Sequence, residues 1–173
     1  IRLSLVGSEM CIRDRISYKP QYLSQEYDGS VKSILSVAYE NEIEGSLIEE
    51  QILFPMGLKK LYEKTVKKLS GGELQKVAVA ACLVRNADIY ALDEPSAFLD
   101  VEDRIALAKF IQRYVRANEK SAIIIDHDVQ LIDLMADSLV IFEGIPGLRG
   151  EASPPLSKEV GMNRFLRALS ITY

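Results

Sequence analysis

The sequence predicts an α/β fold in which helices pack on a parallel sheet. Two short apolar runs, Ile89–Leu92 and Ser121–Ile125, are each followed by an aspartate and are typical of strands buried on both faces of such a sheet. Between them, Glu102–Asn118 places its apolar side chains on one helical face. Strand, helix and strand in this order favour a layered fold with parallel strands.

Turn and capping signals divide the rest of the chain into short elements. We expect further strands at Ile16–Lys19 and Ser138–Phe142, and helices at Ser30–Glu40, Ser46–Met56, Gly71–Arg85, Val129–Ala136 and from Ser157 onward. The helices of about residues 30–85 are expected to form a helical lobe beside the sheet. Gly144–Pro155 is rich in Gly and Pro and is predicted to be a connecting loop or a hinge.

Composition is that of a globular protein of about one domain. The chain has 173 residues, of which 48% are hydrophobic, and a formal net charge of -4. This charge excludes a general basic excess for nucleic-acid binding but not a local basic patch. No apolar run approaches the roughly 20 residues that span a bilayer, so a membrane role would need a partner.

The two cysteines indicate neither a disulfide framework nor a zinc site. Cys11 and Cys82 are far apart and lack the spacing of metal ligands. Cys82 lies in a stretch rich in Ala and Val, so we expect it to be a buried, small apolar residue. This use of cysteine favours a reducing, cytoplasmic compartment.

The first 15 residues, IRLSLVGSEMCIRDR, show no helical or strand periodicity. They resemble a translated sequencing adapter, and we expect residues 1–15 to be non-native. The alternative is a genuine but irregular N-terminal segment. Neither alternative assigns these residues a functional role.

The strongest chemical signal is Leu69-Ser70-Gly71-Gly72-Glu73 at the start of a predicted helix. Glycines leave the backbone N–H groups accessible, and a helix N-terminus carries partial positive charge, so the segment suits a phosphate. The alternative is a serine cap followed by two flexible glycines.

Two further signals follow predicted strands. Asp93 and Glu94 can hold Mg²⁺ and position an attacking water, or they can form a solvated acidic turn before Pro95. His127, the only histidine, can contact a γ-phosphate, and Asp126-His127-Asp128 can alternatively be a capping aspartate with a surface histidine. A metal site on these three residues is less favoured, because consecutive residues at a strand end do not easily converge on one ion.

In this order, the motifs resemble those of the ABC ATPase family from Ile16 to Phe142. The resemblance implies a P-loop NTPase-like parallel sheet core with a helical lobe, and it implies ATP and Mg²⁺ as ligands. Gln21 matches the Q-loop glutamine, which senses Mg²⁺ and the attacking water, Asp93 the metal carboxylate, Glu94 the catalytic glutamate and His127 the switch histidine. Nucleotide contacts are implied for Leu69, Ser70, Gly71, Gly72, Glu73 and Asp100, the last in the D-loop Ser96–Asp100.

One family motif has no counterpart here. No segment matches the phosphate-binding loop Gly-x-x-x-x-Gly-Lys-Ser/Thr, and Gly7 is the only glycine before Gly29. Without that loop, the β- and γ-phosphates lose their main electrostatic partner. We therefore expect an N-terminally truncated fragment that lacks the phosphate-loop strand and is inactive as an isolated chain. Residues 16–143 would be a partial nucleotide-binding domain, and residues 144–173 a hinge-like C-terminal segment.

Details of the sequence resemble the second ATPase domain of the ABC-E class, the RNase L inhibitor-like ribosome-recycling factors of archaea and eukaryotes. The segments that carry this resemblance are Glu94–Glu102, Phe142–Gly147, Ser153–Ser157 and Gly161–Leu166. It implies a second nucleotide-binding domain whose phosphate loop faces the signature motif, which Leu69–Glu73 matches, and closure of the two domains to split ribosomes. It also implies the ribosomal small subunit as a partner, no membrane, and iron–sulfur clusters only in a preceding domain.

The same motifs occur in the ATPase subunits of membrane transporters, which form the alternative function. Transporter subunits often have a glycine-containing loop before the signature motif, whereas Thr65–Lys68 occupies that place here. A non-hydrolysing binding module is the third hypothesis, because the phosphate loop is missing. Cations that can contact ribosomal RNA phosphates, or else form a solvated face, are Arg149, Lys158, Arg164 and Arg167.

Overall fold

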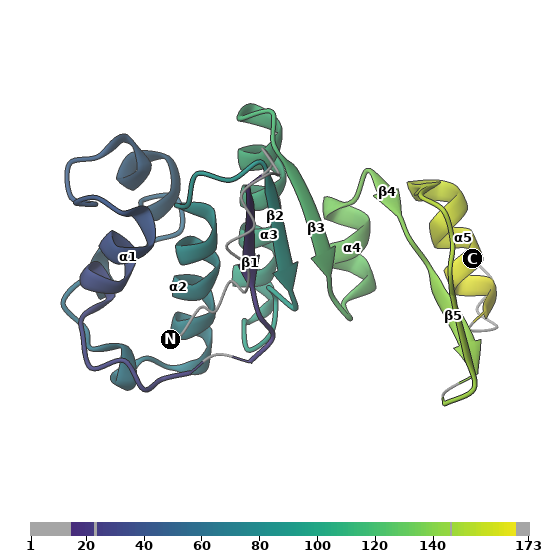
Figure 1. Ribbon diagram of the computed structural model, residues 1–173, viewed down its shortest axis with the longest axis horizontal. Helices are drawn as coiled ribbons and strands as arrows, with labels where there is room; N and C mark the ends of the chain where they lie inside the picture. The colour runs from purple at the N-terminus through teal and green to yellow at the C-terminus, as the bar shows by residue number, and fades with distance from the viewer. Residues whose placement is uncertain (1–14, 23, 146, 169–173) are drawn as a thin grey trace. The chain divides into compact units, whose positions relative to one another are not determined.

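The computed structural model describes residues 15–22, 24–145 and 147–168 (Figure 1). The chain divides into two compact units, Ile1–Asp128 and Val129–Tyr173. Of the segment expected to be non-native, only Arg15 lies within the described residues. The predicted boundary between residues 143 and 144 stays a prediction.

The first unit alternates strands and helices along the chain. Its elements are β1 (Ile16–Lys19), α1 (Val31–Tyr39), η1 (Glu49–Leu53), η2 (Lys59–Leu61), η3 (Val66–Lys68), α2 (Gly71–Leu83), β2 (Ile89–Asp93), α3 (Val101–Ala117) and β3 (Ser121–Ile125). The three strands form a parallel sheet in the order β1-β2-β3. The predicted α/β class with a parallel sheet is therefore confirmed.

The register of the sheet brings three strand ends to one edge. Lys19 pairs with Leu92, which pairs with Ile124, and Asp93 pairs with Ile125. The residues that follow β1, β2 and β3 therefore leave the sheet side by side. Ligands of open parallel sheets bind outside this carboxyl edge.

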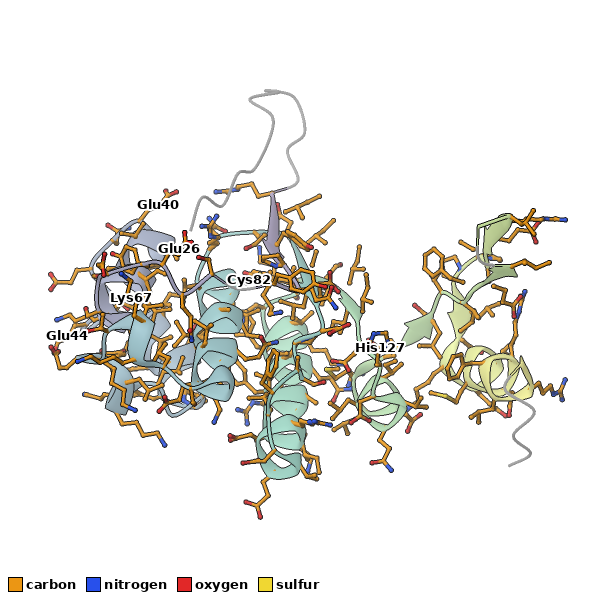
Figure 2. All side chains as sticks on the ribbon, turned by 90° about the horizontal axis from the view of Figure 1, so that it is seen from below. Glu26, Glu40, Glu44, Lys67, Cys82 and His127 are labelled. Atoms are coloured by element: carbon orange, nitrogen blue, oxygen red, sulfur yellow. The ribbon has the colours of Figure 1, made fainter. Side chains whose placement is uncertain are left out.

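Helices α2 and α3 pack on one face of the sheet. On that face Tyr90 and Leu92 of β2 are buried, and the ring of Tyr90 lies against that of Tyr114 on α3 at a centroid distance of 6.1 Å. The Tyr114 hydroxyl donates to the carbonyl of Leu83 on α2 at 3.3 Å. Cys82 is buried on α2, as predicted, and burial raises the pKa of its thiol to about 11 (Figure 2).

Burial of the strands on both faces was expected, and this expectation is wrong for β3. Ile123 and Ile125 are 61% and 58% exposed, and Ile16 on β1 is 52% exposed on the same face. A run of isoleucines is compatible with one covered face or with two, since the pattern does not specify which elements cover the sheet.

The helical lobe is less regular than predicted. Ser30 caps α1 by accepting from the Ser33 amide, as expected. The helix expected over Ser46–Met56 is a short π-helix, η1, followed by turns. Pro55 lacks the backbone N–H that a continuing helix would need. Within η1, the buried Glu49 carboxylate accepts a hydrogen bond from the Tyr62 hydroxyl at 2.9 Å.

The second unit contains α4 (Val129–Met135), β4 (Ser138–Leu139), β5 (Phe142–Ile145), β6 (Arg149–Ala152), β7 (Leu156–Ser157) and α5 (Lys158–Ala168). Strand β4 pairs antiparallel with β7, and β5 with β6. The strand predicted over Ser138–Phe142 is therefore not a further parallel strand, and the expected loop Gly144–Pro155 includes β6. Gly147 allows the hairpin turn, because its φ of 77° is one that other residues rarely adopt.

No helix in the described parts of the chain has both the length and the apolar character needed to cross a membrane.

The sheet packing gives a stability test. Leu92→Ala removes a side chain that is only 1% exposed, so we expect the free energy of unfolding to fall by about 2–5 kcal/mol. Urea unfolding followed by circular dichroism measures this change. Leu47→Ala, at a position 72% exposed, is the matched control and should change stability by about 0.5 kcal/mol at most. Similar losses in both variants would contradict the described core.

Candidate functional site

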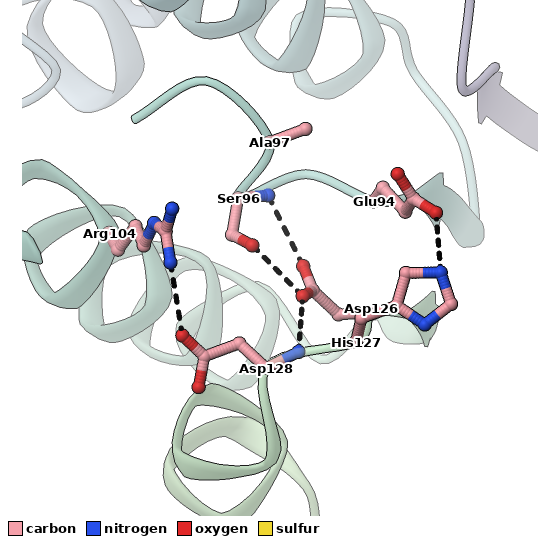
Figure 3. Close-up of a pocket in the computed structure, with 7 residues that line it drawn as sticks. All are labelled: Glu94, Ser96, Ala97, Arg104, Asp126, His127 and Asp128. Atoms are coloured by element: carbon pink, nitrogen blue, oxygen red, sulfur yellow. Dashed lines mark hydrogen bonds and ion pairs between the residues drawn. The ribbon is translucent and has the colours of Figure 1, made fainter. Parts of the chain in front are cut away.

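Three predicted catalytic residues meet at the carboxyl edge of the sheet. Gln21 follows β1, Glu94 follows β2 and His127 follows β3. The Gln21 amide donates through Nε2 to Oε1 of Glu94 at 2.7 Å, and Nε2 of His127 lies 2.8 Å from the same oxygen. The His127 ring faces the Glu94 carboxylate in Figure 3. Parallel pairing therefore gathers residues that are more than 100 positions apart in the chain (Gln21 to His127).

The backbone of Glu94 is held in a left-handed conformation. Its φ is 47°, which costs a residue other than glycine about 1–3 kcal/mol and persists only where neighbours enforce it. The Glu94 amide donates to the carbonyl of Ile125 at 2.7 Å, and the Glu94 carbonyl accepts from Nε2 of Gln75 at 2.5 Å. These two hydrogen bonds hold the main chain of Glu94, and the contacts with Gln21 and His127 hold its carboxylate.

Asp93 ends β2 beside a buried lysine. The Lys19 ammonium donates to the Asp93 carbonyl at 2.6 Å and to the Pro20 carbonyl at 3.0 Å. Burial lowers the pKa of Lys19, and the charge of Asp93 opposes this shift. The Tyr18 hydroxyl donates to Oδ2 of Asp93 at 3.4 Å. Burial, and then the negative charge of Asp93, raise the pKa of Tyr18.

The donor set suits Mg²⁺ only together with a phosphate ligand. Asp93 and Gln21 offer oxygen atoms at adjacent strand ends, which is the ligand type that Mg²⁺ prefers. Among the described residues, no group of three His, Cys, Asp or Glu side chains is arranged to hold a metal ion. Mg²⁺ is commonly bound through one or two carboxylates, with waters and substrate phosphates completing the shell.

A cavity of about 330 Å³ lies beside Glu94 (Figure 3), and it is lined by Glu94, Ser96, Ala97, Arg104, Asp126, His127 and Asp128. Asp126 organises one wall. Its carboxylate accepts from the Ser96 hydroxyl at 2.9 Å, from the Ser96 amide at 3.2 Å and from the Asp128 amide at 2.9 Å.

Asp126 therefore joins the predicted D-loop to the segment that carries His127. It caps the turn as one of the sequence alternatives expects, and the His127 side chain is 86% exposed. The same histidine also contacts the Glu94 carboxylate, which a purely structural turn does not require. The Asp126 carboxylate already accepts hydrogen bonds from Ser96 and Asp128, so the structure gives no support to the less favoured metal site on Asp126, His127 and Asp128.

The segment Leu69–Glu73 forms the N-terminus of α2. Ser70 and Glu73 make a reciprocal capping box, with the Glu73 amide donating to the Ser70 hydroxyl and the Ser70 amide to the Glu73 carboxylate. The amides of Gly71 and Gly72 belong to the first turn, where helices lack intrahelical partners. A Cβ on Gly72 would lie 3.0 Å from the carbonyl oxygen of Phe98, so only glycine fits there without displacing the D-loop.

The described hydrogen bonds do not join this segment directly to Glu94. Glu73 pairs with Lys64 at 2.7 Å, and the Leu69 carbonyl accepts from Gln25 at 3.1 Å. Asp100 is the N-cap of α3, where its carboxylate accepts from the Asp103 amide at 2.8 Å. Nucleotide contacts by Leu69, Ser70, Gly71, Gly72, Glu73 and Asp100 stay predictions.

The predicted phosphate-binding cations of the second unit are largely paired with carboxylates. Arg164 donates to Glu143 at 3.0 and 2.5 Å. Lys158 donates to the carbonyl of Asp133 at 2.9 Å, and Arg149 forms an ion pair with Glu151. Exposed ion pairs of this kind are weak and can exchange for phosphates, so whether Arg149, Lys158, Arg164 and Arg167 contact RNA or form a solvated face stays a prediction.

Sequence reasoning missed three residues that build the site. Lys19 and Gln75 are 1% and 0% exposed, and the guanidinium Nε of Arg104 donates to the Leu99 carbonyl at 2.8 Å. Gln75 lies four residues before Val79 and eight before Leu83, both buried, so it falls on the apolar stripe of α2. A polar residue on such a stripe was the available signal.

Comparison with known proteins gives one consistent set of relatives. A family profile described as "ABC transporter" matches residues 5–97. An uncharacterized ABC transporter ATP-binding protein of Methanocaldococcus jannaschii is 46% identical over 92% of this chain and 26% of that protein. A translation initiation factor of Saccharomyces cerevisiae is 37% identical over 91% of this chain and 26% of that protein.

Among solved structures, the crystal structure of a complex of an archaeal ribosomal stalk protein and an archaeal ribosome recycling factor contains a similar chain. It is 44% identical with a TM-score of 0.84, and the match covers 96% of this chain and 32% of that chain. The chain therefore spans about a quarter (26%) of the length of the curated relatives it matches.

The capping box of α2 predicts a pH-dependent stability difference. The hydrogen bond from Lys64, and then that from the Ser70 amide, hold the pKa of Glu73 below its usual range. The folded state therefore favours the carboxylate, and this stabilisation is present above the unfolded pKa of about 4.3 and lost as pH falls through the folded value. Glu73→Gln should be less stable than the wild type by up to about 1 kcal/mol at pH 7.

The difference between Glu73→Gln and the wild type should shrink toward zero as pH falls below about 4. Urea unfolding at several pH values measures it. Glu50→Gln, which changes an exposed carboxylate of η1, is the control and should differ little from the wild type at any pH. A Glu73→Gln deficit that is the same at all pH values would exclude the ionised capping box as its cause.

Proposed function

The chain belongs to the ABC transporter family, and from this premise we propose that it forms the ATP-hydrolysing part of a protein that recycles ribosomes. The observation that carries the hydrolytic role is the convergence of Gln21 and His127 on one oxygen of Glu94. These two contacts fix the position of the carboxylate at the sheet edge, and a positioned carboxylate can orient a water and act as its general base.

The proposed chemistry is attack of water on the γ-phosphorus of ATP. The bond between the water oxygen and the γ-phosphorus forms, and the bond from that phosphorus to the oxygen bridging to the β-phosphorus breaks. Glu94 orients the water and takes its proton, while Gln21 fixes the carboxylate and the water position. His127, exposed beside Glu94, is placed to donate a hydrogen bond to the γ-phosphate.

Mg²⁺ would be held by Asp93, directly or through water, with the side-chain oxygen of Gln21 as a second ligand. When bound, the ion neutralises charge that develops on the phosphate oxygens. The buried Lys19 keeps the peptide carbonyl of Asp93 fixed, and this orients the strand end from which the carboxylate extends. No metal ligand beyond these two oxygens is proposed from this chain.

The signature segment is proposed to bind the phosphates of a second ATP molecule. The amides of Gly71 and Gly72 and the hydroxyl of Ser70 lie at the N-terminus of a helix of 13 residues, whose dipole favours an anion. Leu69 and Glu73 flank this turn, and Asp100 closes the neighbouring D-loop. The proposed partner is a second nucleotide-binding domain that supplies the phosphate-binding loop, which the 173 residues do not contain.

The ribosomal role rests on the relatives. A translation initiation factor and a chain in a ribosome recycling factor complex are 37% and 44% identical to this chain. Because the chain spans 26% of the length of the curated relatives, ribosome splitting, a small-subunit partner and the action of the whole protein are part of the proposal. Energising a membrane transporter is the competing role that shares the same site residues.

The first test concerns Glu94. In the protein expressed from its complete gene, Glu94→Gln should keep ATP bound and lower kcat for ATP hydrolysis by about 10²- to 10⁴-fold, because the amide cannot accept the proton. A phosphate-release assay and binding of a fluorescent ATP analogue measure the two effects. Glu50→Gln is the matched control and should retain wild-type turnover. Unchanged hydrolysis in Glu94→Gln would contradict the assignment of Glu94 as the general base.

The second test concerns the partner. Because Glu94→Gln should retain ATP, it should trap the closed, ATP-bound protein on its target. We expect it to co-sediment with ribosomal small subunits in sucrose gradients when ATP is present, and less when ADP replaces ATP. Recovery in the membrane fraction would favour the transporter role. Absence of ATP binding would favour a non-hydrolysing module.

A further inference from the structure

Gln75 is a buried polar side chain that contacts the hydrolytic site only through the main chain of Glu94. It lies on α2 and is 0% exposed, among neighbours that are mostly apolar. Burying an amide in such a setting is unfavourable unless its hydrogen bonds are satisfied. The side chain of Gln75 meets this condition only in part.

One end of the Gln75 amide supports the catalytic segment. Its Nε2 donates to the main-chain carbonyl of Glu94 at 2.5 Å. That carbonyl belongs to a residue with φ of 47°, whose side chain contacts Gln21 and His127. The hydrogen bond from α2 therefore acts on the backbone that aims the carboxylate, and not on the carboxylate itself.

The other end of the amide is unsatisfied. Oε1 of Gln75 is buried and has no hydrogen-bond partner among the described residues. A buried acceptor without a donor lowers the stability of the conformation that contains it. An apolar side chain of the same length would remove that deficit but would leave the Glu94 carbonyl without its Gln75 donor, so the two effects on stability offset each other.

Gln75 also lies on the same helix as the signature segment. Gly71 begins α2, and Gln75 follows it by four residues, or about 6 Å along the helix axis. A helix of 13 residues moves as a rigid element over one turn. A shift of the α2 N-terminus is therefore passed through the Gln75 side chain to the Glu94 carbonyl.

We propose that Gln75 is a positioning residue that couples the signature end of α2 to the orientation of Glu94. The proposal rests on the proposed ATPase function. The Gln75 amide already holds the Glu94 peptide in the structure, and a shift of α2 when an anion binds at its N-terminus would move this contact and with it the carboxylate. The nucleotide held by the signature segment thereby controls the hydrolytic carboxylate of the site at the sheet edge.

The test uses Gln75→Met, which keeps the length of the side chain and removes both hydrogen-bonding atoms. In the protein expressed from its complete gene, kcat for ATP hydrolysis should fall by about 10- to 100-fold, with the KM for ATP unchanged. The thermal midpoint should change little, because loss of the unsatisfied Oε1 offsets loss of the donor to the Glu94 carbonyl. Gln51→Met, the same change at an exposed position of η1, should alter none of these quantities.

A double-mutant cycle separates positioning from packing. If Gln75 acts through Glu94, then Gln75→Met should not reduce hydrolysis further in the Glu94→Gln background. Unchanged kcat in Gln75→Met would overturn the proposal, and so would a parallel loss of kcat and thermal midpoint. Failure of the proposed function appears separately, as absence of ATP hydrolysis in the wild-type protein itself, and would overturn both.

Discussion

Parallel pairing of three strands is the constraint on which the rest of this structure depends. With β2 between β1 and β3 and all three running in one direction, Gln21, Glu94 and His127 leave the sheet at the same edge. Each of these three residues comes shortly after the end of its strand, so the register brings their side chains into contact. A shift of one residue in the pairing would turn the side chains of a strand to the opposite face and disperse the site.

The site is supported by polar side chains, whose burial is energetically unfavourable unless they are hydrogen-bonded. The buried Lys19 holds the Asp93 carbonyl, the buried Gln75 holds the Glu94 carbonyl, and the partly buried Asp126 accepts from the Ser96 amide. Each contact is made to or from the main chain of the strand ends or the D-loop. The geometry at Glu94 is thus enforced from several elements at once, which is how a residue with positive φ is maintained at a functional site.

The elements that departed from expectation share a physical origin. Pro55 interrupts the helix expected over Ser46–Met56, and the segment from Ser138 to Ala152 forms antiparallel pairs in place of a parallel strand and a loop. Residues 46–56 were predicted as helical and residues 138–142 as extended, whereas Gly144–Pro155 was predicted to be a loop although it contains β6. Whether an extended segment pairs with a distant strand or folds back as a hairpin depends on tertiary contacts that periodicity does not contain.

The sequence by itself determined the α/β class, the parallel sheet and the identity of the residues at the strand ends, because buried apolar runs and terminal carboxylates are local patterns. The resemblance of its ordered motifs to those of ABC ATPases also implied Gln21, Glu94 and His127 as a catalytic set. Only the tertiary structure decided that these side chains share one carboxylate oxygen, that one face of the sheet is exposed, and that Lys19 and Gln75 hold the strand ends. Such contacts join residues tens of positions apart, and their distances are set by packing between elements, which no local pattern specifies.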